Sequence, residues 1–158
     1  MPTHYRGSKQ EIQALNAYIP LLRAVDTLTS RGTARLEAAG ITPGQFAVLE
    51  ALLHLGPLCQ RELGQKLLRT GGNITMVVDN LEKQGWVRRV RSREDRRFVS
   101  VHLTTKGKRL IERIFPEHAA AVRREMSCLT AAEQESLRRL CRKLGLSNLK
   151  EDEKGRRS

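Results

Sequence analysis

The sequence predicts a mainly α-helical protein that carries one small β-hairpin. Hydrophobic residues make up 39% of the 158-residue chain and aromatic residues only 4%, which favours an aliphatic core packed between helices. Most apolar residues recur at spacings of three and four, as on one face of a helix. Val99, Val101 and Leu103 instead alternate with the residues between them, which is typical of a strand. The length fits one ordinary domain.

Start and stop signals delimit the outer helices. Ser8 with Glu11 and Thr130 with Glu133 form capping-box patterns, in which each side chain bonds the backbone of the other residue. Pro20 is expected to kink or split the first helix, because proline cannot donate the helical hydrogen bond. The predicted helices end at four glycines, namely Gly40, Gly56, Gly85 and Gly145.

Two short helices and a hairpin follow one another in the middle of the chain. The first helix begins near Cys59, which stands at the cap position three residues before Glu62. The second carries an apolar face at helical spacing, made of Ile74, Val77, Val78 and Leu81. A tight turn near residues 69–70 separates them, which indicates a helix-turn-helix. Residues 87–91 and 97–103 then flank a polar tip and predict the hairpin, after which Thr104 caps a long helix.

The positive charge of the chain is concentrated around this hairpin. Lys and Arg outnumber Asp and Glu by 29 to 17, a net charge of +12. Nine of the basic residues and two of the acids lie between Trp86 and Leu110, a net charge of +7. A solvated hairpin tip is one interpretation, but a helix-turn-helix followed by a basic hairpin favours a winged helix that binds double-stranded DNA. In such a domain the second helix enters the major groove and the hairpin reaches the flanking backbone or minor groove.

Other classes of function lack their sequence signals. The three cysteines form no C-x-x-C pair and the four histidines have no ligand-like spacing, so neither disulfides nor a metal is expected. No G-x-S-x-G turn or Gly-rich phosphate loop is present, which argues against an enzyme and against a cofactor. No apolar run reaches ~18 residues and no signal region begins the chain, so a cytoplasmic protein without a membrane partner is expected.

Three blocks of the chain resemble the MarR family of bacterial transcription regulators. "GITPGQFAVLEAL" is similar to the family's second helix, and "ITMVVDNLEKQGWVRR" to its recognition helix and the exit from it. "REDRRFVSVHLTTKG" is similar to the family's wing and the L-T-x-x-G that starts the next helix. The D-x-R element of the family maps to Asp95 and Arg97. The resemblance covers roughly residues 20–146.

The resemblance implies a homodimer on a palindromic operator. It assigns residues 1–40 and 104–148 to dimerisation helices and residues 41–103 to the winged helix-turn-helix. Residues 149–158 are expected to form a disordered tail, because "EDEKGRRS" contains no apolar residue. It also implies a repressor that is released by a small aromatic or phenolic effector, or by thiol oxidation. Winged helices also serve as protein-interaction modules, but those often lose the wing arginines and the polar helix face that this chain keeps.

The predicted DNA contacts lie on the second short helix and on the wing. Asn can bond an adenine edge, and the methyl groups of Thr and Met can touch thymine. Gly71 and Gly72 replace the Ser, Lys or Arg types common in the family. They either allow a phosphate close to the helix start or simply loosen the turn. The predicted residues are Thr70, Gly71, Gly72, Asn73, Thr75, Met76 and Asn80 on the helix, and Arg93, Asp95, Arg96 and Arg97 on the wing.

Two of the predicted site residues have competing interpretations. Asp95 either holds Arg97 in position for a minor groove or only lessens repulsion among the arginines. Cys59 lies at a helix start beside Arg61. The positive end of the helix and the arginine both favour the thiolate form, so Cys59 could be an oxidation sensor. The favoured interpretation is a poor cap that is tolerated. The sequence assigns no residue to ligand binding.

Overall fold

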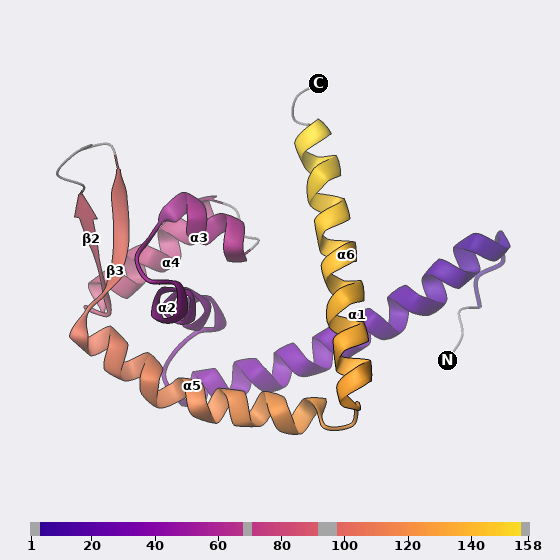
Figure 1. The fold of residues 1–158 in the computed structure, drawn as a ribbon, viewed down its shortest axis with the longest axis horizontal. Coiled ribbons are helices and arrows are strands. Elements are labelled where there is room, and N and C mark those ends of the chain that lie inside the picture. Colours follow the sequence, from indigo (N-terminus) through magenta and orange to yellow (C-terminus); the bar gives the residue numbers. More distant parts are fainter. Residues whose placement is uncertain (1–3, 68–70, 92–97, 156–158) are drawn as a thin grey trace. The chain divides into compact units, whose positions relative to one another are not determined.

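The computed structural model describes residues 4–67, 71–91 and 98–155 and confirms a mainly helical winged helix (Figure 1). The chain divides into two compact units, residues 1–118 and 119–158, and helix α5 continues from the first into the second. The elements in chain order are α1 Lys9–Ala38, α2 Pro43–Leu55, β1 Leu58–Cys59, α3 Gln60–Leu67, α4 Gly71–Lys83, β2 Val87–Arg91, β3 Val99–Leu103, α5 Thr105–Met126 and α6 Ala131–Gly155.

The capping residues begin the helices as predicted. Ser8 and Thr42 each accept a hydrogen bond from the backbone three residues later, and the capping boxes of α1 and α2 are complete. The expected split at Pro20 is wrong, because α1 runs without interruption from Lys9 to Ala38. Pro20 removes one helical hydrogen bond, but it lies on an exposed side of the helix where water can solvate the opened turn.

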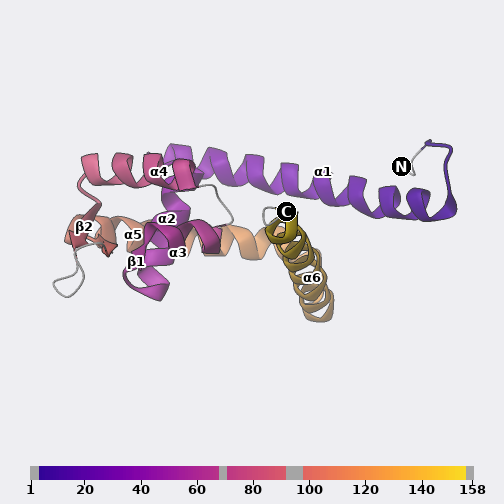
Figure 2. The same ribbon diagram turned by 90° about the horizontal axis from the view of Figure 1, so that it is seen from above.

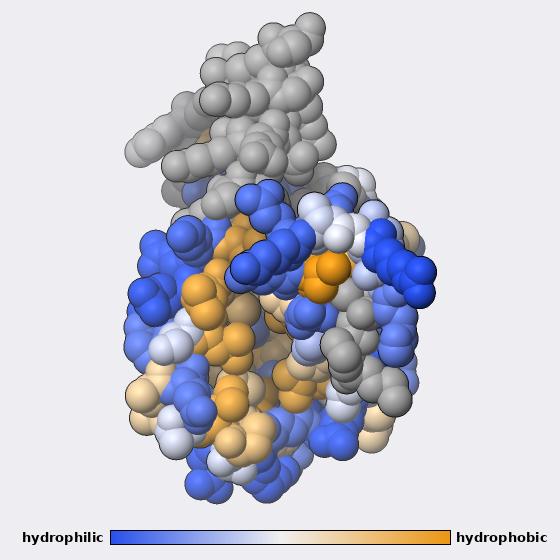
Figure 3. All heavy atoms as spheres, turned by 90° about the vertical axis from the view of Figure 1, so that its right-hand side faces the viewer, coloured by the Kyte–Doolittle hydropathy of each residue, from blue (hydrophilic) through white to orange (hydrophobic). Residues whose placement is uncertain are grey.

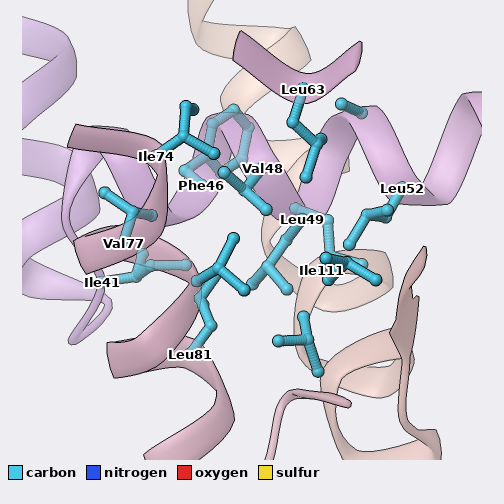
Figure 4. Close-up of a cluster of buried hydrophobic side chains, with 14 of the residues drawn as sticks. Ile41, Phe46, Val48, Leu49, Leu52, Leu63, Ile74, Val77, Leu81 and Ile111 are labelled. Carbon is cyan, nitrogen blue, oxygen red and sulfur yellow. The ribbon is translucent and has the colours of Figure 1, made fainter. Parts of the chain in front are cut away.

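The core of the first unit lies where α2, α3, α4 and α5 meet (Figure 4). The two short central helices bury the side predicted for them: Leu63 of α3 is buried, and so is the whole apolar face of α4. Aliphatic residues dominate, with Phe46 the buried aromatic ring among the residues described. The labelled side chains of Figure 4 converge from all four helices and from Ile41 in the loop before α2; the helical ones are Phe46, Val48, Leu49, Leu52, Leu63, Ile74, Val77, Leu81 and Ile111.

The hairpin is part of a sheet with three strands in the order β1-β3-β2. β2 and β3 pair antiparallel from Val87↔Leu103 to Arg91↔Val99, which confirms the predicted hairpin strands. The sequence did not predict β1, whose two residues pair with Val101 and Ser100 of β3. Within the first unit, the hairpin lies at the end opposite to the start of α1 (Figures 1 and 2).

The last helix is longer than predicted. Thr130 and Glu133 form the expected capping box at its start. The helix does not end at Gly145, as expected, but continues to Gly155, over part of the segment predicted to be disordered. Glycine in an exposed helix costs only about 1 kcal/mol relative to alanine, so the good helix formers on both sides can carry the helix across it.

Candidate nucleic-acid interface

The exposed side of α4 presents polar and methyl-bearing groups away from the core. Asn73, Thr75, Met76 and Asn80 are all exposed, and the side chain of Met76 is 60% accessible. The opposite side of the same helix is buried in the core of the first unit. The predicted division of α4 into a buried face and an outward face is therefore confirmed, and four of the predicted contact residues share the outward face.

The start of α4 contains the two glycines that the sequence singled out. Both Gly71 and Gly72 lie in the helix, and a Cβ at Gly72 would meet no atom within 4 Å. The packing of the protein itself therefore does not require glycine at position 72. Both interpretations of the pair stay open, and Thr70 lies outside the described residues.

Thr75 forms a hydrogen bond with the preceding helix, which the sequence did not indicate. The side-chain amide of Gln60, the first residue of α3, donates a hydrogen bond of 3.1 Å to the Thr75 hydroxyl. The two residues stand 15 positions apart, so local spacing gives no signal for this pair. The bond links the start of α3 to the outward face of α4.

Cys59 caps α3 with the geometry of a capping box. Its thiol accepts a hydrogen bond from the backbone N–H of Glu62 at 3.5 Å. In return, the Cys59 N–H donates to the Glu62 carboxylate at 2.7 Å. This backbone bond, with a smaller contribution from the Cys59 side chain, lowers the pKa of Glu62. The predicted cap is confirmed, and it places an anionic carboxylate beside a half-buried cysteine.

An arginine of the hairpin joins the wing to the recognition helix. Arg89 of β2 contacts Asp79 and Glu82 of α4, each at 2.5 Å, and its backbone N–H donates to Glu82 at 2.9 Å. Burial lowers the pKa of Arg89, but the hydrogen bonds and charges of the two carboxylates outweigh it and raise the pKa overall. The sequence did not predict this cluster. The sign of this cluster in the sequence is that Arg89 stands two residues after buried Val87, so both lie on the same face of the strand.

The wing also joins the start of α5 through a close backbone contact. Thr104 donates its hydroxyl to the Gly85 carbonyl at 2.7 Å and accepts from the Gly107 N–H at 3.0 Å. A Cβ at Gly107 would overlap the carbonyl oxygen of Trp86. The glycine of the L-T-x-x-G pattern therefore allows α5 to pack closely against Trp86, which follows the turn after α4.

The wing tip itself lies outside the described residues, and with it the predicted contacts Arg93, Asp95, Arg96 and Arg97. Strand β2 is described and carries exposed Arg88 and Arg91, and exposed Phe98 directly precedes β3. The paired strands thus hold Arg88 and Arg91 at one end of the first unit (Figure 1).

Comparison with known proteins identifies the family. The model of the MarR family matches residues 39–97. The chain is 35% identical over 140 residues to the HTH-type transcriptional regulator YkoM of Bacillus subtilis, a match that covers 88% of this chain and 91% of YkoM. The chain belongs to the MarR family. The HTH-type transcriptional regulator MhqR of the same organism is also 35% identical, with coverage of 85% of this chain and 93% of MhqR.

Two solved structures share the fold. Sco3205 of Streptomyces coelicolor, solved in complex with DNA, has a TM-score of 0.78 at 27% identity and covers 90% of each chain. NadR, solved in complex with 4-hydroxyphenylacetate, has a TM-score of 0.71 at 26% identity, with coverage of 91% of this chain and 97% of NadR. This MarR-family chain is therefore a DNA-binding transcription regulator with a winged helix.

Two further kinds of site are absent from the part of the chain that the structure describes. No group of three or more His, Cys, Asp or Glu side chains there could hold a metal ion. None of the helices in that part of the chain is both long and apolar enough to cross a membrane.

Proposed function

We propose that this MarR-family regulator is a homodimeric repressor of a palindromic operator. The observation that carries the proposal is the outward face of α4 beside the basic hairpin. Asn73 and Asn80 would bond adenine edges, while Thr75 and Met76 would touch thymine methyl groups. The wing arginines would enter the flanking minor groove, with Arg97 inserted and Asp95 holding it in position.

The exposed apolar residues of the terminal helices support a dimer. On α1 they recur at helical spacing, as they do on α6, and such stripes are more often buried in an interface than left in water. Apolar residues, orange in Figure 3, reach the surface among polar ones. Residues 1–40 and 104–148 would form the dimer, and residues 41–103 would bind DNA. The stripes contain Tyr18, Leu22, Val25 and Leu28 on α1, and Leu137, Leu140 and Leu144 on α6.

A small aromatic or phenolic effector would release the repressor. The support for this part is the relative NadR, which was solved with 4-hydroxyphenylacetate and shares 26% of its residues with this chain. An effector that binds the DNA-free conformation better than the DNA-bound conformation weakens operator binding. The size of the effect is limited by the ratio of the effector's affinities for the two conformations.

Selection of bound sites from random DNA tests the proposal. The expected product is a palindrome whose half-site centres lie about 10 base pairs apart. Its affinity should fall steeply with salt, because the arginines displace counterions. Repeating the selection with phenols, quinones and peroxide would identify the class of effector. A monomer that binds an isolated half-site equally well would contradict the dimeric model, and recovery of no site would favour the protein-interaction module.

Thiol oxidation at Cys59 is the second candidate mechanism of release. Cys59 lies at the start of α3, whose first residue Gln60 contacts Thr75 on the proposed DNA-reading face. Oxidation that breaks the cap would therefore disturb that face. In the sensor mechanism, Cys59→Ser keeps operator binding and ignores peroxide, and serine also restores an ordinary cap. An unchanged peroxide response in this variant would return Cys59 to a purely structural role.

A further inference from the structure

A basic pocket opens at the root of the hairpin, where Trp86 meets the start of α5. It has a volume of ≈ 330 Å³ and is lined by Trp86, Lys106, Arg109, Leu110 and Arg113. The four residues of α5 are spaced i, i+3, i+4 and i+7, so they lie on one face of the helix. Trp86 follows the turn after α4 and completes the pocket from the side of the hairpin.

The pocket gathers three cations and no acidic side chain among its lining residues. Lys106 donates from its Nζ to the Gln84 carbonyl at 3.0 Å. Arg109 and Arg113 have no hydrogen bond or ion pair with any residue that the structure describes. Like charges at i, i+4 repel one another on a helix. Elsewhere on α5 the protein avoids this cost, because Lys108 pairs with Glu112 at 3.8 Å.

The backbone around the pocket is held in place without any ligand. Thr104 donates its backbone N–H to the Trp86 carbonyl at 3.0 Å, and Gly107 packs directly against the same residue. The aromatic wall and the basic helix face therefore keep a fixed relation to one another. A preformed site binds more tightly than one that must be ordered on binding.

Contacts of the wing tip with DNA do not explain these cations. Trp86 directly precedes β2, and Arg91 ends that strand five residues later. A strand rises roughly 3.3 Å per residue, so the pocket lies about 16 Å from the end of β2. Gln84 directly follows α4, and Asn73 stands 11 residues before it, about 16 Å along the helix axis at 1.5 Å per residue. The pocket thus lies far from the wing tip and from the start of α4, and Asn80, about one helical turn before Gln84, is the nearest residue proposed to contact DNA.

We propose that this pocket binds a phosphate monoester that carries a planar ring, of the type of a nucleoside monophosphate. Two guanidinium groups and an ammonium group suit a dianionic phosphate better than a singly charged carboxylate, and guanidinium forks match phosphate oxygens. The indole of Trp86 and the side chain of Leu110 offer an apolar wall on which a ring can stack. The volume is within the range of small-molecule sites.

The single tryptophan of the chain provides a direct measurement, since Trp86 is itself a wall of the pocket. AMP is titrated into the full-length protein without DNA, with excitation near 295 nm, where adenine does not absorb. A saturable change in emission is expected, confirmed by calorimetry. Adenosine, inorganic phosphate and benzoate should each bind at least tenfold more weakly, because each lacks the ring or the dianionic group.

Two variants and a matched control locate the site. Arg109→Gln and Arg113→Gln should each weaken AMP binding at least tenfold, while Arg139→Gln on α6 makes the same change of charge and should bind like the parent. The proposal is overturned if AMP gives no saturable signal, if inorganic phosphate or benzoate binds as tightly as AMP, or if both pocket variants bind AMP like the parent. Asn73→Ala should lose operator affinity and keep AMP binding, so a failed operator model would not be mistaken for a failed pocket.

Discussion

At the scale of single residues, Gly107 determines how closely α5 approaches the turn after α4. A side chain there would overlap the Trp86 carbonyl, which already accepts a hydrogen bond from the Thr104 N–H. We predict that Gly107→Ala destabilises the protein by roughly 1–3 kcal/mol, because the overlap must be relieved by moving backbone rather than a flexible side chain. Urea unfolding at a fixed protein concentration measures the loss, since dimerisation would make stability depend on concentration.

Gly145→Ala is the matched control for this prediction. Gly145 lies within α6, and a Cβ there would meet no atom within 4 Å. Alanine should therefore stabilise the helix by about 0.5–1 kcal/mol, the ordinary difference in helix propensity. If both variants gained stability, the close contact between Gly107 and Trp86 would not be a constraint on the fold.

At the scale of elements, Arg89 holds the wing against the recognition helix. Its side chain is 24% accessible and bridges two carboxylates that lie one turn apart on α4. We predict that Arg89→Gln lowers the free energy of unfolding by about 1–2 kcal/mol, a value reduced for partial exposure, because Asp79 and Glu82 then face each other without a cation. Operator affinity should fall as well, since the wing loses its fixed position beside α4.

Arg88→Gln is the control for the Arg89 prediction, because it removes the same charge from an exposed neighbour. It should leave the stability nearly unchanged. Adding Asp79→Asn and Glu82→Gln to Arg89→Gln should recover part of the lost stability by removing the repulsion. Equal losses in Arg88→Gln and Arg89→Gln would show that only net charge matters.

The cap of α3 predicts a dependence on acid. The Cys59 N–H lowers the pKa of Glu62 below its ordinary 4.5 in the folded protein. The stabilisation is therefore complete above pH 4.5 and is lost as the pH falls through the lowered pKa. Glu62→Gln keeps an uncharged capping group, so the variant should lose less stability than the parent between pH 5 and pH 3. Parallel pH profiles of urea unfolding would contradict a role for the Glu62 charge.

The elements that the sequence predicted are those whose signals are local. Ser8 with Glu11 and Thr42 with Gln45 act within one helical turn, so residue types alone reveal them. Strand β1 has two residues and forms only because it pairs with β3, so no hydrophobic periodicity in the sequence predicts it. The partners of Arg89 lie 7 and 10 residues away on another element, and Gln60 meets Thr75 only after the helix-turn-helix has folded.

At the scale of the whole molecule, the exposed apolar stripes on α1 and α6 predict that a monomer leaves an interaction surface uncovered. On α6, the side chain of Leu140 is 58% accessible, and on α1 that of Val25 is 52% accessible. Stable dimers bury roughly 800 Å² or more on each partner, and central apolar residues dominate such interfaces. We predict that Leu140→Glu shifts the protein toward monomer, because dimerisation would then bury a charge without a partner. Analytical ultracentrifugation across a range of concentrations measures the shift.

The same variant separates loss of dimerisation from loss of DNA reading. A monomer still presents the outward face of one α4, so Leu140→Glu should keep the weak affinity for a single half-site. It should lose most of the added affinity for the full palindrome, because the second half-site no longer binds as part of one molecule. Arg139→Glu places a negative charge on the neighbouring exposed position and should remain dimeric. If Leu140→Glu stays dimeric and binds the palindrome like the parent, α6 does not contribute to the interface, and the dimer must form through other surfaces such as the stripe on α1.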